Sequence, residues 1–396
     1  MLTGALFNTK GSKKMKKTLI SAAVICAVCG SAYASDVTLY GVVDTGLSYS
    51  YVDDDVAGES AEHAFEMASG QTAGSRFGLK GTEDVAEGFK VGFVLENGFQ
   101  SDTGALSTAG KIFDREAQLF IDTTYGKLSF GRVGLLHSDA GSFGMMGDLS
   151  AFGTGWGDII GNQNMVFAYK PARMDNTVTY VSPDIYGLKI HAQYSMGTSS
   201  AKTTTDRTQV ENESSTNRYF ALGASYKLEA LELYGLVDYV NKASYSDVAA
   251  DSLAHHGKDQ YTVTLGGNYD FDVAKVYLAA QYFDNASEVG GEADDDGTGF
   301  DLAKNDKAYG DIEGYGIVAG TAVPVCGGSV KFTAGYMHAE SDKTNKKANR
   351  WTAGAGYQYP VSKRTNVYTG VGYVQDSVNN RDPYAVQVVA GVKHSF

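Results

Sequence analysis

Residues 75–99 read SRFGLKGTEDVAEGFKVGFVLENGF, and the alternation of side chains in this stretch decides the fold. Apolar side chains share one parity on both sides of the polar segment TEDVAEG: Phe77, Leu79, Val91, Phe93 and Leu95. Polar residues and glycine occupy the other parity: Arg76, Gly78, Lys80, Lys90, Gly92 and Glu96. Successive side chains of a strand point to opposite faces, so the pattern predicts a hairpin with one apolar and one polar face.

The same alternation recurs along the chain. We count sixteen segments, which start near residues 37, 74, 89, 112, 127, 173, 188, 218, 230, 260, 274, 312, 329, 350, 365 and 384. Short turns such as TTYGK and PVSKRT alternate with long polar loops near 54–73, 101–111, 135–172, 196–217, 242–259, 284–311, 340–349 and 377–383. Alternating short turns and long loops are typical of outer-membrane barrels, and strands of about ten residues span a bilayer when tilted.

These segments predict an all-β fold: a 16-stranded antiparallel transmembrane β-barrel. The apolar parity faces lipid and the polar parity faces a water-filled interior, because a closed barrel pairs every backbone group and sixteen strands leave an aqueous lumen. Tyr357, Tyr359 and Phe396 are candidates for aromatic girdles at the membrane interface. No linker or composition shift divides residues 35–396, so we expect one domain.

The overall composition fits this fold. The 396 residues include 48 Gly, 26 Tyr and 18 Phe but only 5 Pro, and scarce proline suits long paired strands because proline removes a hydrogen-bond donor. The start of the chain combines basic KKMKK, an apolar run over 18–32 and Ala32-Tyr33-Ala34. This pattern predicts a secretory signal peptide over 1–34, cleaved after Ala34, with Met15 as an alternative start.

Charge and cysteine content exclude other classes. Removal of residues 1–34, which carry five lysines and no acid, changes the formal charge from −13 to −18. So acidic a chain is not expected to bind nucleic acid. Cys326 is the one cysteine left, so neither an intrachain disulfide nor a cysteine metal site is expected. No zinc-binding spacing or nucleophile motif is present, and we expect no cofactor, no metal and no enzymatic activity.

Several motifs carry a family resemblance. They are SDVTLYG (35–41), the stretch 75–99, YGKLSFGR (125–132), PVSKRTNVYTGVGY (360–373) and the C-terminal GVKHSF. Together they resemble the Gram-negative general porin family, most closely its beta-proteobacterial type. The resemblance implies a trimeric, sixteen-stranded outer-membrane porin whose third loop folds into the pore. It also implies a constriction with arginines on one wall and carboxylates on the other.

The resemblance places four charged residues at this constriction: Arg76, Glu96, Arg115 and Arg173. Parity independently puts Arg76 in the lumen beside Lys80, and puts Arg173 there too. Arg115 has the parity of the lipid face. Either a bulge re-aims Arg115, which we favour because a charge facing lipid costs about 2–4 kcal/mol at mid-depth, or Glu116 occupies the lumen instead.

The third loop, residues 135–171, is rich in glycine and apolar residues and has few charges. That composition fits a loop packed inside a barrel. Its acids are Asp139, Asp148 and Asp158. The sequence does not decide which of them faces the arginines, and we choose Asp148 and Asp158.

The predicted function is a channel for passive diffusion of ions and small hydrophilic solutes. Phe396 resembles the family's C-terminal signal for the barrel-insertion machinery, and the other expected partners are two further copies of the chain, outer-membrane lipid and lipopolysaccharide. A substrate-specific channel is the alternative, followed by an outer-membrane barrel hydrolase, which needs an activated nucleophile with a base in reach.

Overall fold

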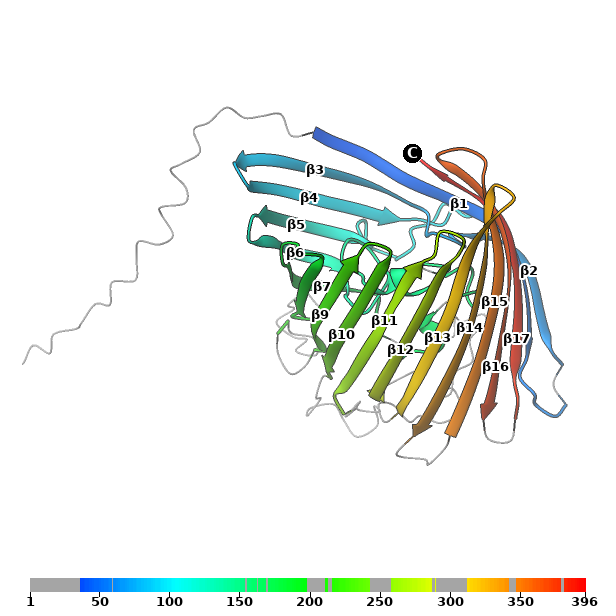
Figure 1. Ribbon diagram of the computed structural model, residues 1–396. Helices are drawn as coiled ribbons and strands as arrows, with labels where there is room; N and C mark the ends of the chain where they lie inside the picture. The colour runs from blue at the N-terminus through cyan, green and yellow to red at the C-terminus, as the bar shows by residue number, and fades with distance from the viewer. Residues whose placement is uncertain are drawn as a thin grey trace, which may run out of the picture.

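The computed structural model describes residues 36–396 except 59, 154, 162, 169, 198–210, 213–215, 243–257, 287–288, 290–311, 342–346 and 379–380. The predicted signal peptide lies outside the described residues. The described residues form one antiparallel sheet that closes into a barrel (Figure 1). None of them belongs to a helix long and apolar enough to cross a membrane.

The sheet has seventeen strand segments. They are β1 (Asp36–Asp53), β2 (Glu62–Ser69), β3 (Arg76–Ala86), β4 (Phe89–Gly98), β5 (Glu116–Thr123), β6 (Gly126–Gly134), β7 (Arg173–Val181), β8 (Leu188–Ser195), β9 (Arg218–Leu228), β10 (Leu231–Asn241), β11 (Gln260–Asp270), β12 (Lys275–Ala286), β13 (Ile312–Val325), β14 (Gly328–Ser341), β15 (Lys347–Pro360), β16 (Thr365–Val378) and β17 (Tyr384–Ser395). Two short 3₁₀ helices, η1 (Met146–Leu149) and η2 (Gln163–Met165), lie in the third loop.

Seventeen segments fill sixteen positions in the wall. β1 pairs with β17 along most of its length, which closes the barrel. The other edge of β1 is shared, because residues 36–42 pair with β3 and residues 45–52 pair with β2. β2 and β3 are therefore two parts of one interrupted strand position. The predicted sixteen-stranded antiparallel barrel is confirmed.

The strand β2 corrects one prediction from the sequence. Residues 54–73 read as a polar loop, but residues 62–69 continue the wall beside β1. Between β2 and β3, residues 70–75 leave the wall and turn inward. Asp44 of β1 is fully buried and holds this segment in place. Its Oδ2 accepts hydrogen bonds from Thr72 N (2.9 Å), Thr72 Oγ1 (2.5 Å) and Ala73 N (2.9 Å), and its Oδ1 accepts one from Tyr368 Oη (2.5 Å).

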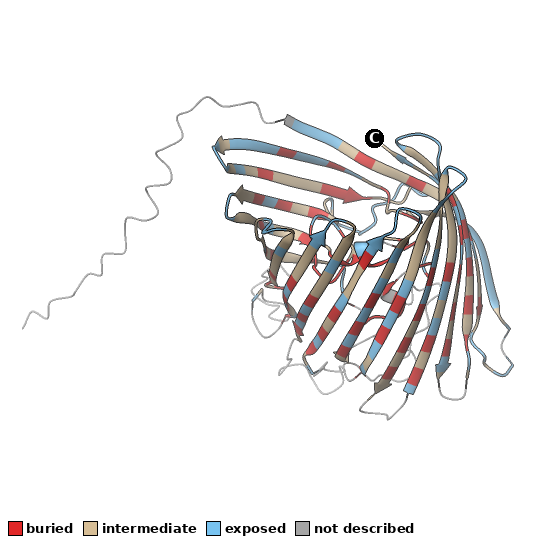
Figure 2. Ribbon diagram, in the orientation of Figure 1, coloured by how far each residue is buried: buried red, intermediate tan, exposed pale blue. Residues whose placement is uncertain are grey.

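The two faces of the wall have the predicted polarity. Apolar side chains of the outer face are exposed, with Leu79 at 38%, Leu265 at 62% and Trp351 at 58%. Many of the residues between them along the strands are buried, such as Thr264 and Arg350, and Figure 2 shows this as alternating bands of colour. An apolar outer surface is the property that a lipid bilayer requires of a barrel.

The third loop fills part of the interior with an apolar core. Its buried side chains include Leu135, Leu136, Phe143, Met145, Met146, Leu149, Val166 and Phe167. They pack with inward-facing apolar residues of the wall, among them Leu236 of β10, Phe283 of β12 and Met337 of β14. The expectation that the inner face is polar throughout is therefore wrong for this part of the wall, where the loop replaces water.

Buried polar contacts fix the third loop to the wall. Lys170 Nζ forms an ion pair with Asp238 of β10 and donates a hydrogen bond to Thr262 Oγ1 of β11 (2.7 Å). Arg350 of β15 is also fully buried, pairs with Asp376 and donates a hydrogen bond to the Met165 carbonyl oxygen (3.1 Å). Removing one partner of such a buried pair costs about 3–5 kcal/mol, so the loop is held firmly against the wall.

Candidate functional site: a charged constriction

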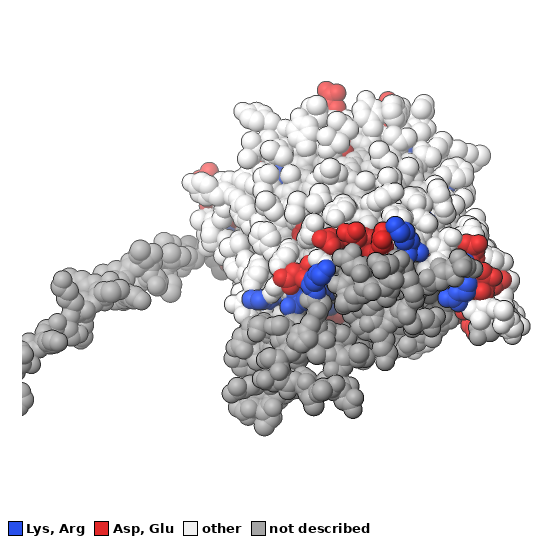
Figure 3. All heavy atoms as spheres, turned by 90° about the horizontal axis from the view of Figure 1, so that it is seen from below, with Lys and Arg blue, Asp and Glu red and all other residues white. Residues whose placement is uncertain are grey.

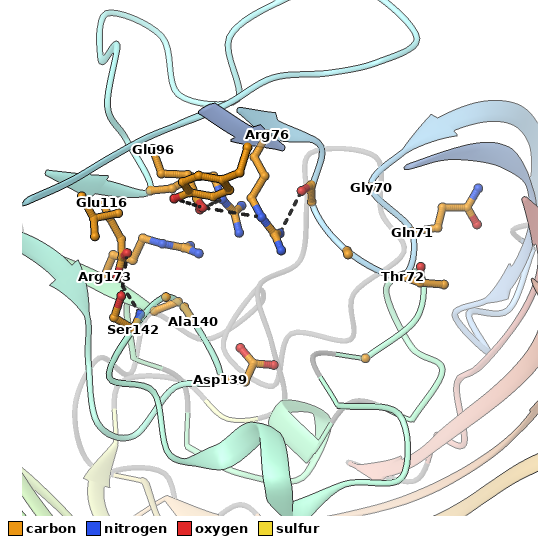
Figure 4. A pocket seen from close by; sticks show the side chains of 18 of the residues that line it. Gly70, Gln71, Thr72, Arg76, Glu96, Glu116, Asp139, Ala140, Ser142 and Arg173 are labelled. Atoms are coloured by element: carbon orange, nitrogen blue, oxygen red, sulfur yellow. Dashed lines mark hydrogen bonds and ion pairs between the residues drawn. The ribbon is translucent and has the colours of Figure 1, made fainter. Parts of the chain in front are cut away.

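A cavity of about 520 Å³ lies between the wall, the third loop and residues 70–74. β3, β4, β5 and β7 supply its wall side (Figure 4). Its charged lining residues are Arg76, Lys80, Glu96, Arg115, Glu116, Asp139 and Arg173. Four cations thus share one space with three carboxylates.

Glu96 is the centre of the first charge cluster. Its Oε1 accepts a hydrogen bond from Arg115 Nε (2.7 Å), and its Oε2 lies 3.6 Å from Arg76 Nε. Tyr40 Oη donates a further hydrogen bond to Oε2 (2.9 Å), and Lys80 Nζ lies 5.1 Å from the centre of the same tyrosine ring. Glu96 is 7% exposed, so its negative charge is neutralised mainly by the guanidinium groups of Arg115 and Arg76 rather than by water.

The structure answers the question that parity left open about Arg115. β5 begins at Glu116, and its pairing with β4 shows no register shift, so no bulge is present between these strands. Arg115 reaches the lumen because it precedes the strand. Glu116 also faces inward, where its carboxylate accepts hydrogen bonds from Ser142 N (2.6 Å) and Ser142 Oγ (2.9 Å) of the third loop. Both residues line the cavity.

Arg173 opens β7 and lines the same cavity. Its register partner is Gly134, the last residue of β6, so the side chain lies where the third loop leaves the wall and returns to it. The Nε atom of Arg173 is buried without a hydrogen-bond partner among the described residues. A guanidinium that is not fully paired can attract an anion into the cavity.

The structure brings one third-loop acid to the arginines, and it is Asp139. Asp148 instead accepts a hydrogen bond from Tyr234 Oη of β10 (2.8 Å). Asp158 accepts one from Gln387 Nε2 of β17 (2.7 Å). Neither of these two acids lines the charged cavity. The structure therefore differs from our prediction that Asp148 and Asp158 face the arginines. Both bind the wall at positions farther along the loop.

Asp139 has a raised pKa in the cavity. Asp139 lies in the third loop, outside the spanning strands, and burial raises its pKa from 3.8 to about 6, against the opposing effect of Arg173 and Arg115. Its carboxyl is neutral below pH 6 and charged above it. The raised pKa also means that the Asp139 contribution to folding stability is present at low pH and declines as pH rises from about 4 to about 6.

We therefore expect anion preference to fall as pH rises through about 6, because Asp139 gains its negative charge there. Reversal potential under a salt gradient between pH 4.5 and pH 7.5 measures this change. In Asp139→Asn the step should disappear, with anion preference fixed at the level of the wild type at low pH. A step that persists in Asp139→Asn assigns the titration to another group.

Two features of the cavity were missed from the sequence. Asp139 follows five residues after the end of β6, so its backbone stays near β5 and β7. This short distance along the chain is the sequence feature that could have indicated Asp139 as the acid near the arginines. The segment 70–74 was hidden in a predicted polar loop. Among the described residues, no group of three His, Cys, Asp or Glu can hold a metal ion, and Cys326 is exposed and free.

Comparison with known proteins places this barrel in a family. Residues 21–379 match the family model described as Gram-negative porin. An outer membrane porin protein of Bordetella pertussis is 30% identical over 409 residues, covering 96% of this chain and all of that protein. Among solved structures, the anion-selective porin from Comamonas acidovorans has a TM-score of 0.65 at 22% identity over 91% of this chain and 100% of that one. The trimer form of OmpT from Vibrio cholerae has a TM-score of 0.60 at 14% identity, over 92% and 100%.

The closed barrel, its apolar outer face and its charged internal cavity define a channel protein of the outer membrane. The chain belongs to the Gram-negative porin family. It is an outer-membrane porin through which solutes diffuse passively.

Proposed function

We propose that the charged cavity is the constriction of the pore and that it gives the channel a weak preference for anions. The observation that carries this proposal is the lining itself: Arg76, Lys80, Arg115 and Arg173 outnumber the carboxylates of Glu96, Glu116 and Asp139. Charges at a narrow opening bordered by protein act on passing ions at short range. The solved anion-selective porin from Comamonas acidovorans has the same fold and supports this direction.

The constriction also acts on uncharged solutes. Arg76 and Arg173 lie on the wall, while Asp139 lies on the third loop across the cavity (Figure 4). Opposite charges across a narrow opening create a transverse field that orders water and disfavours apolar solutes. Small hydrophilic solutes are thus the preferred class, without selection of one compound.

The porin assembles as a homotrimer in this proposal, with outer-membrane lipid and lipopolysaccharide against its apolar outer face. The trimer form of OmpT from Vibrio cholerae, which shares the fold, supports the assembly state. The C-terminal Phe396 is the signal for the barrel-insertion machinery. Residues 1–34 direct the chain across the inner membrane and are then removed.

The channel function is favoured over catalysis by the composition of the cavity. A barrel hydrolase needs a nucleophile with a base in reach. Ser142 lines the cavity, but its hydroxyl donates to Glu116 and no histidine is among the described lining residues. A substrate-specific channel would require an ordered aromatic track, whereas Tyr40 is the one aromatic residue among those described around the constriction.

Liposome swelling tests the channel function directly. We expect proteoliposomes to swell in neutral sugars at rates that fall with increasing sugar size, because a fixed opening excludes solutes by width. Pentoses should enter faster than disaccharides, and trisaccharides more slowly still. Vesicles that stay impermeable to pentoses, although they contain folded barrels, contradict the proposal. Fast entry of one large sugar ahead of smaller ones indicates the substrate-specific alternative.

A further inference from the structure

A second cavity lies next to the constriction, on the side of the long loops. Its volume is about 250 Å³. The two cavities share the lining residues Gly70, Gln71 and Gly157. Gly157 N of the third loop donates a hydrogen bond to the Gln71 carbonyl oxygen (2.7 Å), and this contact separates them. Ser48 and Glu66 place the second cavity nearer to the end of the barrel that carries the long loops.

The two cavities have opposite charge. Glu66, Asp102 and Asp158 line the second one, together with the amides of Gln71, Gln100 and Gln387, and no lysine or arginine is among its described lining residues. The constriction has four cations. A space lined by carboxylates and amides attracts cations and can accept several hydrogen bonds from them.

Asp158 is fixed in position at this cavity. Its carboxylate accepts a hydrogen bond from Gln387 Nε2 (2.7 Å), while Gln387 Oε1 accepts one from the Asp158 backbone N–H (2.9 Å). Gln387 is itself held by Ser48, to whose Oγ its Nε2 also donates (3.2 Å). A carboxylate fixed from the wall loses little freedom when a ligand binds, which favours affinity.

Gln71 supplies independent evidence for a ligand. Its side chain is 5% exposed, and neither its amide oxygen nor its amide nitrogen has a hydrogen-bond partner among the described residues. A buried polar group left without a partner costs about 1–3 kcal/mol. Figure 4 shows this side chain extending away from the arginine cluster. A donor in the second cavity would satisfy the amide oxygen.

We propose that the second cavity binds a small organic cation with primary ammonium groups. The three carboxylates come from different parts of the lining: Glu66 from β2, Asp102 from the loop after β4 and Asp158 from the third loop. They therefore suit a cation with separated charges. Each ammonium has three N–H donors, and the acceptors are the carboxylates of Glu66 and Asp102 and the side-chain amide oxygen of Gln71. Passive diffusion needs no such site, so this inference goes beyond the proposed function.

Single-channel recording with butane-1,4-diamine tests the site. We expect the diamine, added on the side of the long loops, to block the current in brief events whose frequency rises with concentration. Butylamine should give shorter events, because it has one charge, and butane-1,4-diol should give none. In Glu66→Gln/Asp102→Asn the block lifetime should fall at least tenfold, and in Gln71→Leu it should fall severalfold.

The matched control is Asp54→Asn/Asp382→Asn. It removes two exposed carboxylates at the same end of the barrel without touching the cavity, and it should keep the block of the wild type. Equal weakening in both double variants shows that general surface charge attracts the diamine, which overturns the proposal.

Calorimetry of folded protein in detergent separates this inference from the channel function. Diamine binding that is lost in Glu66→Gln/Asp102→Asn supports the site even if the protein failed to conduct. Absence of binding to the wild type overturns the site, whatever the conductance. The variants are compared as heat-modifiable folded barrels, and Gln71→Leu keeps all three acids should the double variant not fold.

Discussion

Replacing Arg76 and Arg173 by alanine should shift the channel from weak anion preference toward cation selectivity and raise its conductance. The change leaves two cations against three carboxylates in the cavity. A unit charge about 4 Å from a passing ion contributes about 1 kcal/mol even at the dielectric constant of water, so the permeability ratio should change severalfold. Loss of two long side chains also widens the opening. Reversal potential under a salt gradient measures the ratio.

Salt concentration separates the constriction from the outer mouth. Figure 3 shows acidic side chains, with basic ones between them, on the face that carries the long loops. Residues 35–396 as a whole carry a formal charge of −18. Salt screens such exposed charges within about 8 Å at physiological ionic strength, so the wild type should favour anions at high salt and drift toward cations at low salt. Lys363→Ala/Arg364→Ala, in an exposed turn, is the charge-matched control. If Arg76→Ala/Arg173→Ala kept the ion preference of the wild type at high salt, these arginines would not control permeation.

Deletion of Phe396 should greatly reduce the amount of folded porin in the outer membrane. Phe396 lies in the seam that closes the barrel, where its N–H donates to the Gly41 carbonyl oxygen (3.0 Å) and its own carbonyl oxygen accepts from Gly41 N (3.1 Å). Its ring also covers Gly41, because a Cβ at that position would lie 2.3 Å from a ring carbon. The deletion removes both the closing pair of hydrogen bonds and the proposed signal. Heat-modifiable bands from outer-membrane fractions give the level.

Val392→Ala is the control for apolar area alone. Val392 lies on β17, the strand that leads to Phe396, and is 46% exposed, close to the 45% of Phe396. Its truncation should lower the level of folded protein only slightly. Normal levels of folded trimer in the Phe396 deletion contradict the assembly role.

The wall was predictable because lipid contact acts on every second residue of each strand. Apart from β2, the strands begin within a few residues of the predicted positions, and eight begin at them: β4, β7, β8, β9, β11, β13, β16 and β17. β2 was missed because the turn-forming segment GQTAGS (70–75) interrupts its strand position. A short strand before such a break resembles a loop when it is read alone, and its pairing with β1 is a long-range contact.

The constriction was only partly predictable, since it depends on how the third loop packs. Arg76, Lys80, Glu96 and Arg173 follow from parity or resemblance and do line the cavity. The position of Asp139 depends on where the loop turns inside the barrel. Contacts far apart in sequence hold the loop on either side of it, from Leu136 N to Gln193 Oε1 (3.0 Å) and from Ser142 N to Glu116 Oε1 (2.6 Å). Local pattern contains no information about such contacts.

The apolar core of the third loop makes the barrel wall asymmetric around its circumference. Along β9 to β14, inward residues such as Leu236, Phe283 and Met337 are buried against the third loop. The outward residues of the same strands face lipid. Where the third loop covers it, this arc has apolar contacts on both sides, comparable to the central layer of a three-layer protein. Its sequence is constrained on both faces. β3, β4, β5 and β7 instead line the charged cavity with inward side chains, so the residues that control permeation are free of the apolar packing that the third loop imposes elsewhere on the wall.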